Sequence, residues 1–118
     1  MLFRSNFGWN VFEGTHRFRA GSAERAVDPV FEYAHAGDAC SITGGVVARD
    51  PRLPASLEGA YLFADYCSGE VSAVLTTRDL ETLPLGLRLD APTTFGTAPD
   101  GTVLVASQRG SLYRLVPR

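Results

Sequence analysis

The two cysteines, Cys40 and Cys67, restrict the fold of this chain more than any other feature. Each lies where a strand-like segment meets a turn, in the stretches Cys-Ser-Ile-Thr-Gly-Gly and Asp-Tyr-Cys-Ser-Gly. A bond between them would close a loop and contribute on the order of 3 kcal/mol in the chain-entropy model. We therefore predict a disulfide that staples neighbouring strands of a small β unit in an oxidising compartment. The alternative is a pair of free, buried thiols.

The segments that follow Cys40 are short and rich in β-branched or apolar residues. Turn formers separate them, most clearly at 50–54 and 99–101. A spacing of ~8–12 residues is typical of β-sandwiches and propellers, and no amphipathic helix of about ten residues or more is expected. The predicted strands are 41–49, 59–66, 71–77, 83–89, 93–97, 102–107 and 111–116.

Two stretches of the chain resemble each other. Residues 59–71 and 101–112 both run from a glycine through an apolar strand to a second glycine turn and a further strand. Their offset is close to the ~40–45 residues of a four-stranded propeller blade. The pattern indicates an all-β fold with an internal repeat, and it leaves a sandwich open as the alternative.

The first third of the chain is rich in loops. Residues 6–40 are interpreted as a lead-in, in which 30–33 is predicted as a short strand. The segment 2–5, Leu-Phe-Arg-Ser, is also what a common sequencing adaptor encodes, so residues 1–5 are interpreted as a non-native scar. The alternative is a genuine N-terminal arm. The sequence therefore predicts that the natural protein begins near Asn6.

Composition excludes several classes of partner. The formal charge of −2 on 118 residues gives no general electrostatic case for nucleic acid or an anionic membrane. All 11 basic residues are arginine, which a GC-rich coding sequence explains. No run of ~18 apolar residues is present, so no membrane span is expected. Hydrophobic content of 45% is ordinary for a globular domain.

Catalytic motifs are absent from the sequence. It contains no P-loop, no dinucleotide-binding glycine pattern, no zinc-type cysteine and histidine spacing and no nucleophile elbow. Only two histidines occur, His16 and His35, which does not favour a self-contained hydrolase. We therefore predict no catalytic residue and no metal ligand within the chain.

Two polar residues are candidates for a binding site. His35, just before Cys40, is predicted at a pocket mouth, where it could exchange protons near neutral pH; the alternative is a loop histidine bonded to backbone. Arg49 ends an apolar strand and could hold a carboxylate bidentately. Its alternative is an ion pair with Asp50 or Asp65.

Two further segments could form part of a site. Thr43, Gly44 and Gly45 would let the backbone approach a flat ligand, or else mark a bulge or tight strand packing. Phe7 and Trp9 could line a pocket, although aromatic side chains more often simply bury area. These residues complete the set of candidate binding positions.

The segment 6–10 (Asn-Phe-Gly-Trp-Asn) and the two cysteine frames together resemble the C-terminal part of the glucose/sorbosone dehydrogenase family. That family includes soluble quinoprotein sugar dehydrogenases and hedgehog-interacting-protein-like proteins. The resemblance covers nearly the whole chain after Ser5. It implies about two blades of a six-bladed propeller with four-stranded antiparallel sheets, residues 41–90 forming one blade and 91–118 part of the last. It also implies a secreted or periplasmic protein.

The resemblance further implies a cofactor and a substrate. Many family members are thought to oxidise aldoses at C1 and pass the electrons to pyrroloquinoline quinone, held with calcium on one face of the propeller. By position, Arg49 matches a basic residue near the quinone carboxylates, and Thr43 and Gly44 lie on the adjoining strand. Phe7 and Trp9 match the segment near the cofactor and sugar. The calcium ligands and the catalytic histidine belong to N-terminal blades outside this sequence.

Three departures from the family pattern bear on function. Phe7 replaces the usual tyrosine, residues 93–96 stand where a quinone-contacting arginine pair is expected, and a second cysteine pair is missing near Arg17. The leading hypothesis is a fragment of a quinone-dependent sugar dehydrogenase that is inactive alone. The alternative is a non-catalytic extracellular propeller that binds protein or glycan, as in the hedgehog-interacting-like branch. A third is an unrelated sandwich with a binding role.

Overall fold

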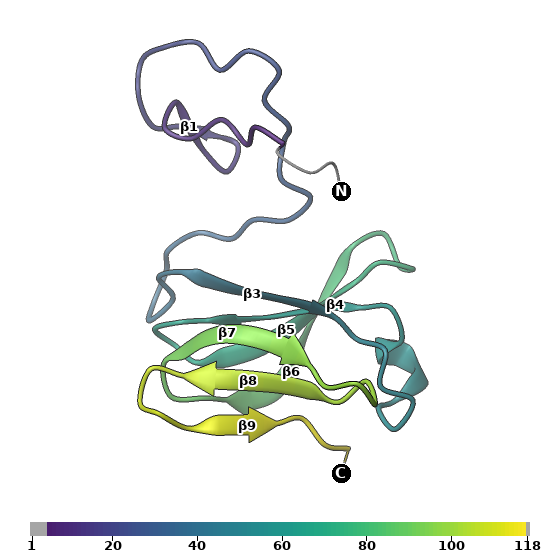
Figure 1. The fold of residues 1–118 in the computed structure, drawn as a ribbon. Helices are drawn as coiled ribbons and strands as arrows, with labels where there is room; N and C mark the ends of the chain where they lie inside the picture. Colours follow the sequence, from purple (N-terminus) through teal and green to yellow (C-terminus); the bar gives the residue numbers. More distant parts are fainter. Residues whose placement is uncertain (1–4, 118) are drawn as a thin grey trace. The chain divides into compact units, whose positions relative to one another are not determined.

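Strands and turns make up the ordered structure of this protein. The computed structural model describes residues 5–117, and within them the only helix is a single 3-10 turn, η1, at Ala55–Leu57. The chain divides into two compact units, Met1–Tyr33 and Ala34–Arg118 (Figure 1). The all-β prediction is confirmed. The boundary between these units follows Tyr33, and four of the five residues interpreted as a scar, 1–4, lie outside the described residues.

The first unit contains a small hairpin that the sequence did not predict. Its strands are β1, Phe12–Glu13, and β2, His16–Arg17, which pair antiparallel. The Glu32 carboxylate accepts hydrogen bonds from the Thr15 amide at 2.7 Å and the Thr15 hydroxyl at 2.6 Å. The prediction of a strand at 30–33 is wrong: these residues are not in a strand, and the Glu32 side chain among them binds the hairpin turn.

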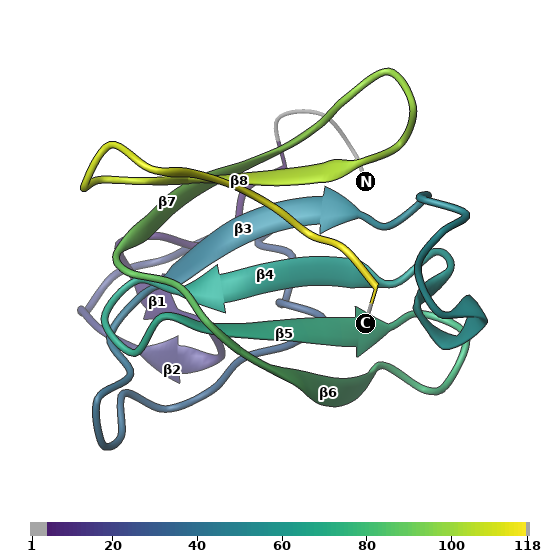
Figure 2. The ribbon, with the colours of Figure 1, turned by 90° about the horizontal axis from the view of Figure 1, so that it is seen from below.

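The second unit begins with a four-stranded antiparallel sheet in the order β3-β4-β5-β6 (Figure 2). The four predicted strands are confirmed with small shifts in their ends. Pro84 lies in the outer strand, the place in a sheet where a residue without an N–H donor is tolerated. The strands are β3 Ile42–Val47, β4 Tyr61–Asp65, β5 Glu70–Leu75 and β6 Glu81–Arg88.

A three-stranded antiparallel sheet follows, in the order β7-β8-β9. Its first strand lies beside β3, and the Thr43 hydroxyl donates to the Pro92 carbonyl oxygen at 3.0 Å across this junction. The strands are β7 Pro92–Thr97, β8 Val103–Ser107 and β9 Leu112–Arg114. The predicted repeat therefore coincides with the second and third strands of both sheets.

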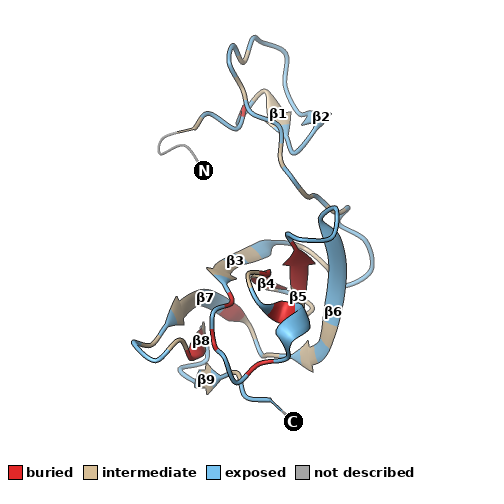
Figure 3. Cartoon of the chain, turned by 90° about the vertical axis from the view of Figure 1, so that its right-hand side faces the viewer, coloured by how far each residue is buried: buried red, intermediate tan, exposed pale blue. Residues whose placement is uncertain are grey.

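The core lies between the two sheets. Leu62 of β4 and Val103 of β8 are fully buried there, with Ala73 and Leu75 of β5 beside them. Figure 3 shows this burial concentrated on β4 and β5, whereas β6 is exposed along most of its length. Burying a leucine side chain contributes about 1.5–3 kcal/mol, so this layer holds the second unit together.

The two sheets do not pack through equivalent faces. Leu62 and Leu104 occupy the same place in β4 and β8, counted from the first residue of each strand. Leu62 is buried in the layer between the sheets, whereas Val103 and Val105, not Leu104, turn to that layer from β8. Because side chains alternate between the faces of a strand, one face of the first sheet packs on the opposite face of the second.

No described helix is long and apolar enough to cross a membrane.

Candidate functional site

The predicted disulfide is present. Cys40 precedes β3 and Cys67 follows β4, with their Cα atoms 5.6 Å apart. Cys67 is exposed, and Cys40 is half-buried. The bond therefore joins the start of the first strand to the end of its neighbour, at one rim of the four-stranded sheet.

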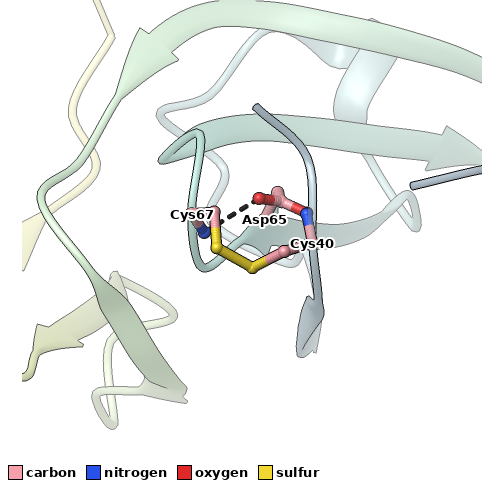
Figure 4. Close-up of side chains that lie close together, drawn as sticks. All are labelled: Cys40, Asp65 and Cys67. Atoms are coloured by element: carbon pink, nitrogen blue, oxygen red, sulfur yellow. Dashed lines mark hydrogen bonds between the residues drawn. A yellow bond between two sulfur atoms is a disulfide. The ribbon is translucent and has the colours of Figure 1, made fainter. Parts of the chain in front are cut away.

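Asp65, the last residue of β4, lies beside both half-cystines (Figure 4). One carboxylate oxygen, Oδ2, accepts the backbone N–H groups of Cys40 and Ser41, each at 3.0 Å. The other, Oδ1, accepts those of Cys67 at 2.9 Å and Ser68 at 2.8 Å. Asp65 is 5% exposed. Hydrogen bonds to an ionised acceptor are stronger than neutral ones. This carboxylate is therefore a second link between the two cysteine segments, in addition to the disulfide.

The same three residues have the composition of a metal-ligand set. The ligand atoms of Cys40, Asp65 and Cys67 lie within 4.8 Å of one another. Both sulfurs, however, are used in the disulfide, and each carboxylate oxygen already accepts two N–H donors. The donor set is thus occupied by the protein itself and does not fit a metal ion.

The glycine pair in β3 forms the bulge that the sequence suggested. The register with β4 shifts between Gly44 and Val46. A Cβ on Gly45 would lie 2.1 Å from the Leu62 carbonyl oxygen and 2.8 Å from the Tyr61 ring, and one on Gly44 would lie 2.7 Å from the Tyr61 hydroxyl. These glycines are explained by close approach of the protein's own Tyr61, and the Thr43 hydroxyl is used at the β3–β7 junction.

Arg49, two residues after β3, is exposed. Neither alternative partner holds it: Asp50 pairs with Arg52, and Asp65 binds backbone N–H groups. No ion pair of Arg49 occurs among residues 5–117. Its guanidinium is therefore available to an anionic ligand.

An ion cluster that the sequence did not single out connects the loop after β3 with the turn between β7 and β8. Arg52 binds the buried Asp50 bidentately, at 2.7 and 2.9 Å, and Asp100 at 3.1 Å, and it also contacts the Thr102 hydroxyl. The Arg52 hydrogen bonds lower the pKa of Asp50, and those from Thr102 lower the pKa of Asp100. This cluster links the two sheets.

The predicted aromatic residues lie in the first unit and are solvent-exposed. Trp9 is 69% exposed and stacks on Phe18 with a centroid distance of 5.2 Å, while the Arg19 guanidinium lies 5.6 Å from the Phe18 ring. Phe7 is also exposed and borders a small hollow with Phe12. The Trp9–Phe18 stack is an exposed aromatic surface. The sequence offered no sign of this partner, because the hairpin between Trp9 and Phe18 has strands of only two residues, too short for a periodic signal.

His35 is exposed, at the start of the second unit. Within residues 5–117 its side chain makes no hydrogen bond and no ion pair. The alternative of a histidine bonded to nearby backbone is therefore not observed, and the prediction that His35 contacts substrate stays a prediction.

The sequence indicates the role of Asp65 only in part. Asp65 belongs to the Asp-Tyr-Cys-Ser-Gly frame and is one of the two alternative partners of Arg49. An aspartate two residues before a turn amide is a common Asx-turn signal, which would have found Oδ1 and its two donors. The two donors from 40–41 depend on the fold of the sheet.

No protein-family model matches this chain, and no solved structure matches it.

Proposed function

We propose that residues 34–118 form two successive blades of a larger extracellular β-propeller, and that this wedge supplies one wall of a quinone site in a sugar dehydrogenase. The observation that carries the proposal is the packing of non-equivalent faces. Sheets that meet through equivalent faces form a closed pair, whereas contacts between non-equivalent faces can repeat, and they generate a ring when the rotation from sheet to sheet closes. The packing of the two sheets is of the repeating kind.

The outer face of the second sheet supports this reading. Leu104 and Ala106 of β8 are only half-buried, and Leu112 of β9 is 69% exposed. They lie on the face equivalent to that of Leu62, which the second sheet covers. A further blade packed in the same manner would bury these side chains.

Arg49 is the residue that fits the cofactor. Pyrroloquinoline quinone is a planar tricarboxylate that, when bound, accepts the electrons removed from the sugar. The exposed guanidinium of Arg49 suits a carboxylate of that type in a bidentate arrangement. Thr43 and Gly44 fit less well, because the hydroxyl is donated to Pro92 and the space beside the glycine contains the Tyr61 hydroxyl. The role proposed for this chain is binding and not proton transfer.

The test uses the complete propeller of the proposal, in which residues 34–118 form two of the blades. Dye-linked aldose oxidation is measured with added quinone and calcium. Arg49→Gln is expected to raise the half-saturating quinone concentration roughly tenfold, since a charge-assisted bidentate pair is lost. Arg78→Gln, in the exposed turn between β5 and β6, is the matched control and should behave as wild type. Absence of oxidation with every aldose tested contradicts the proposal.

The Trp9–Phe18 stack favours a second candidate, a non-catalytic glycan-binding propeller. Exposed, stacked aromatic rings offer a rigid surface at low entropic cost. Trp9 is the only tryptophan in the sequence, so its fluorescence reports directly on this surface. Titration with oligosaccharides should change that fluorescence in wild type and much less in Phe18→Ala. A signal that no oligosaccharide changes speaks against this candidate.

A further inference from the structure

We propose that Cys67 is a site of reversible thiol–disulfide exchange, and that Asp65 is a positioning residue that keeps Cys40 and Cys67 together when their bond is open. The proposal concerns the rim of the four-stranded sheet and is independent of the quinone site. It rests on the four backbone N–H groups that converge on one carboxylate beside the disulfide.

The two half-cystines differ in their exposure as whole residues. Cys67 is exposed in the turn after β4, whereas Cys40 is half-buried at the start of β3. A thiolate must approach the sulfur that it attacks, so access selects the site of exchange. An external thiolate therefore attacks Sγ of Cys67.

The exchange runs in two balanced steps with a small thiol, such as glutathione, as reductant. In the first, the glutathione thiolate bonds to Sγ of Cys67, the Cys40–Cys67 bond breaks, and Cys40 leaves as a thiolate that takes a proton from water. In the second, another glutathione thiolate attacks the glutathione sulfur of the mixed disulfide. Cys67 leaves as a thiolate, and oxidised glutathione is released.

Asp65 determines what happens between these steps. Opening the bond leaves the Cys40 and Cys67 amides on the same carboxylate, and the Ser41 carbonyl oxygen still accepts the Tyr66 amide at 2.8 Å. Cys40 thus stays beside Cys67. After its thiol loses the proton to water, the thiolate attacks Sγ of Cys67, which restores the original bond and releases glutathione as a thiolate. Pre-organisation of this kind raises the effective concentration of one thiol at the other.

The experiment measures that effective concentration in glutathione buffers, by acid quenching, alkylation and mass spectrometry. Asp65→Asn places an NH2 group opposite two N–H donors and so breaks part of the link between the two segments. The effective concentration of the Cys40 thiol at Cys67 should therefore fall about tenfold or more. Ser68→Ala keeps its backbone N–H on Asp65 and is the matched control, expected within about twofold of wild type. Equal values for wild type and Asp65→Asn overturn the proposal.

Two further readouts separate positioning from a general structural role. In reduced wild type, the amides of Cys40, Ser41, Cys67 and Ser68 should stay protected from hydrogen exchange. In the mixed-disulfide intermediate, the glutathione adduct should lie on Cys67. Loss of protection at these amides in a chain that is otherwise folded overturns the proposal, as does an adduct mainly on Cys40. These measurements need only wild-type protein, so they decide the matter even where Asp65→Asn does not fold.

Discussion

The two sheets of the second unit use the same strand order with different polar residues at one equivalent position. Asp65 ends β4 and Ser107 ends β8. The Asp65 carboxylate accepts four backbone N–H groups, from the turn that follows and from residues 40–41. The Ser107 hydroxyl accepts one, from Arg109 at 3.0 Å, and donates to the Asp90 carbonyl oxygen at 2.5 Å.

The difference shows how one position can be strengthened. In both sheets this side chain ties a turn to the segment that precedes the first strand. An anion with two oxygens gathers several donors, while a hydroxyl offers one proton and two lone pairs. The four-stranded sheet adds a disulfide at the same place, whereas the three-stranded sheet adds only an exposed ion pair, Arg109–Asp90 at 3.3 Å.

The largest expected loss of stability follows from removing the side chain at this equivalent position in each sheet. Asp65→Ala leaves four part-buried N–H groups without their acceptor. It should lower the free energy of unfolding by about 4 kcal/mol, since a hydrogen bond to a charged group contributes about 1.5–3 kcal/mol and water recovers part of that loss at the exposed donors. Ser107→Ala should lower it by about 1 kcal/mol. Urea unfolding of both variants is the measurement. Equal losses would show that the two positions are not distinguished by charge.

The next effect tests the packing of non-equivalent faces. Leu62→Ala opens a cavity between the sheets and should destabilise the fold by about 3 kcal/mol. Leu104→Ala, at the matching place in β8 but only half-buried, should cost about 1 kcal/mol or less. Thermal and urea unfolding check both values. A larger loss for Leu104→Ala would mean that its face is covered in solution, for example by a second copy of the chain.

A smaller effect compares the first strands of the two sheets. Gly45→Ala drives a Cβ into the Leu62 carbonyl oxygen and should cost about 2 kcal/mol, within the range for overpacking. Gly96→Ala in β7 meets no atom within 4 Å and should be neutral or stabilising by about 0.5 kcal/mol. Chemical denaturation of the two variants is sufficient. A neutral Gly45→Ala would argue against the bulge geometry.

The smallest effect concerns the ion cluster that links the sheets. The folded-state pKa of Asp50 is lowered by its Arg52 hydrogen bonds, so this contribution to stability is complete above the unfolded-state pKa of about 3.9. It is lost as pH falls from there through the folded-state pKa. Urea midpoints at neutral pH and near pH 3 should therefore differ less in Asp50→Asn than in wild type. An identical pH dependence in both proteins would exclude the cluster as a cause.

Local patterns in the sequence were sufficient for the strands of the second unit. β4, β5 and β8 are short apolar or alternating runs between turn formers, and the glycine pair in β3 correctly indicated a bulge. The first unit was predicted less well. Its hairpin strands are only two residues long, too short for a periodic signal, and the segment 30–33 was wrongly predicted as a strand.

The candidate site was predictable only in part. The Cys40–Cys67 bond followed from two cysteines at strand–turn junctions, and it is present. The sequence identified Arg49 as a candidate for binding a carboxylate. It did not decide whether that carboxylate belongs to Asp50, to Asp65 or to a ligand. Only the structure shows Arg52 on Asp50 and backbone N–H groups on Asp65, because these pairings depend on how separate loops meet.

The sequence by itself determined that the chain forms short strands and where most of them lie after Cys40, and it favoured a bond between Cys40 and Cys67 over two free thiols. Those properties depend on side-chain alternation, turn residues and loop closure, all of which are local or involve a single bond. Only the tertiary structure decided which face of each sheet is covered, which donors converge on Asp65 and which carboxylates receive Arg52. These depend on contacts between segments far apart in the chain, whose geometry no local pattern specifies.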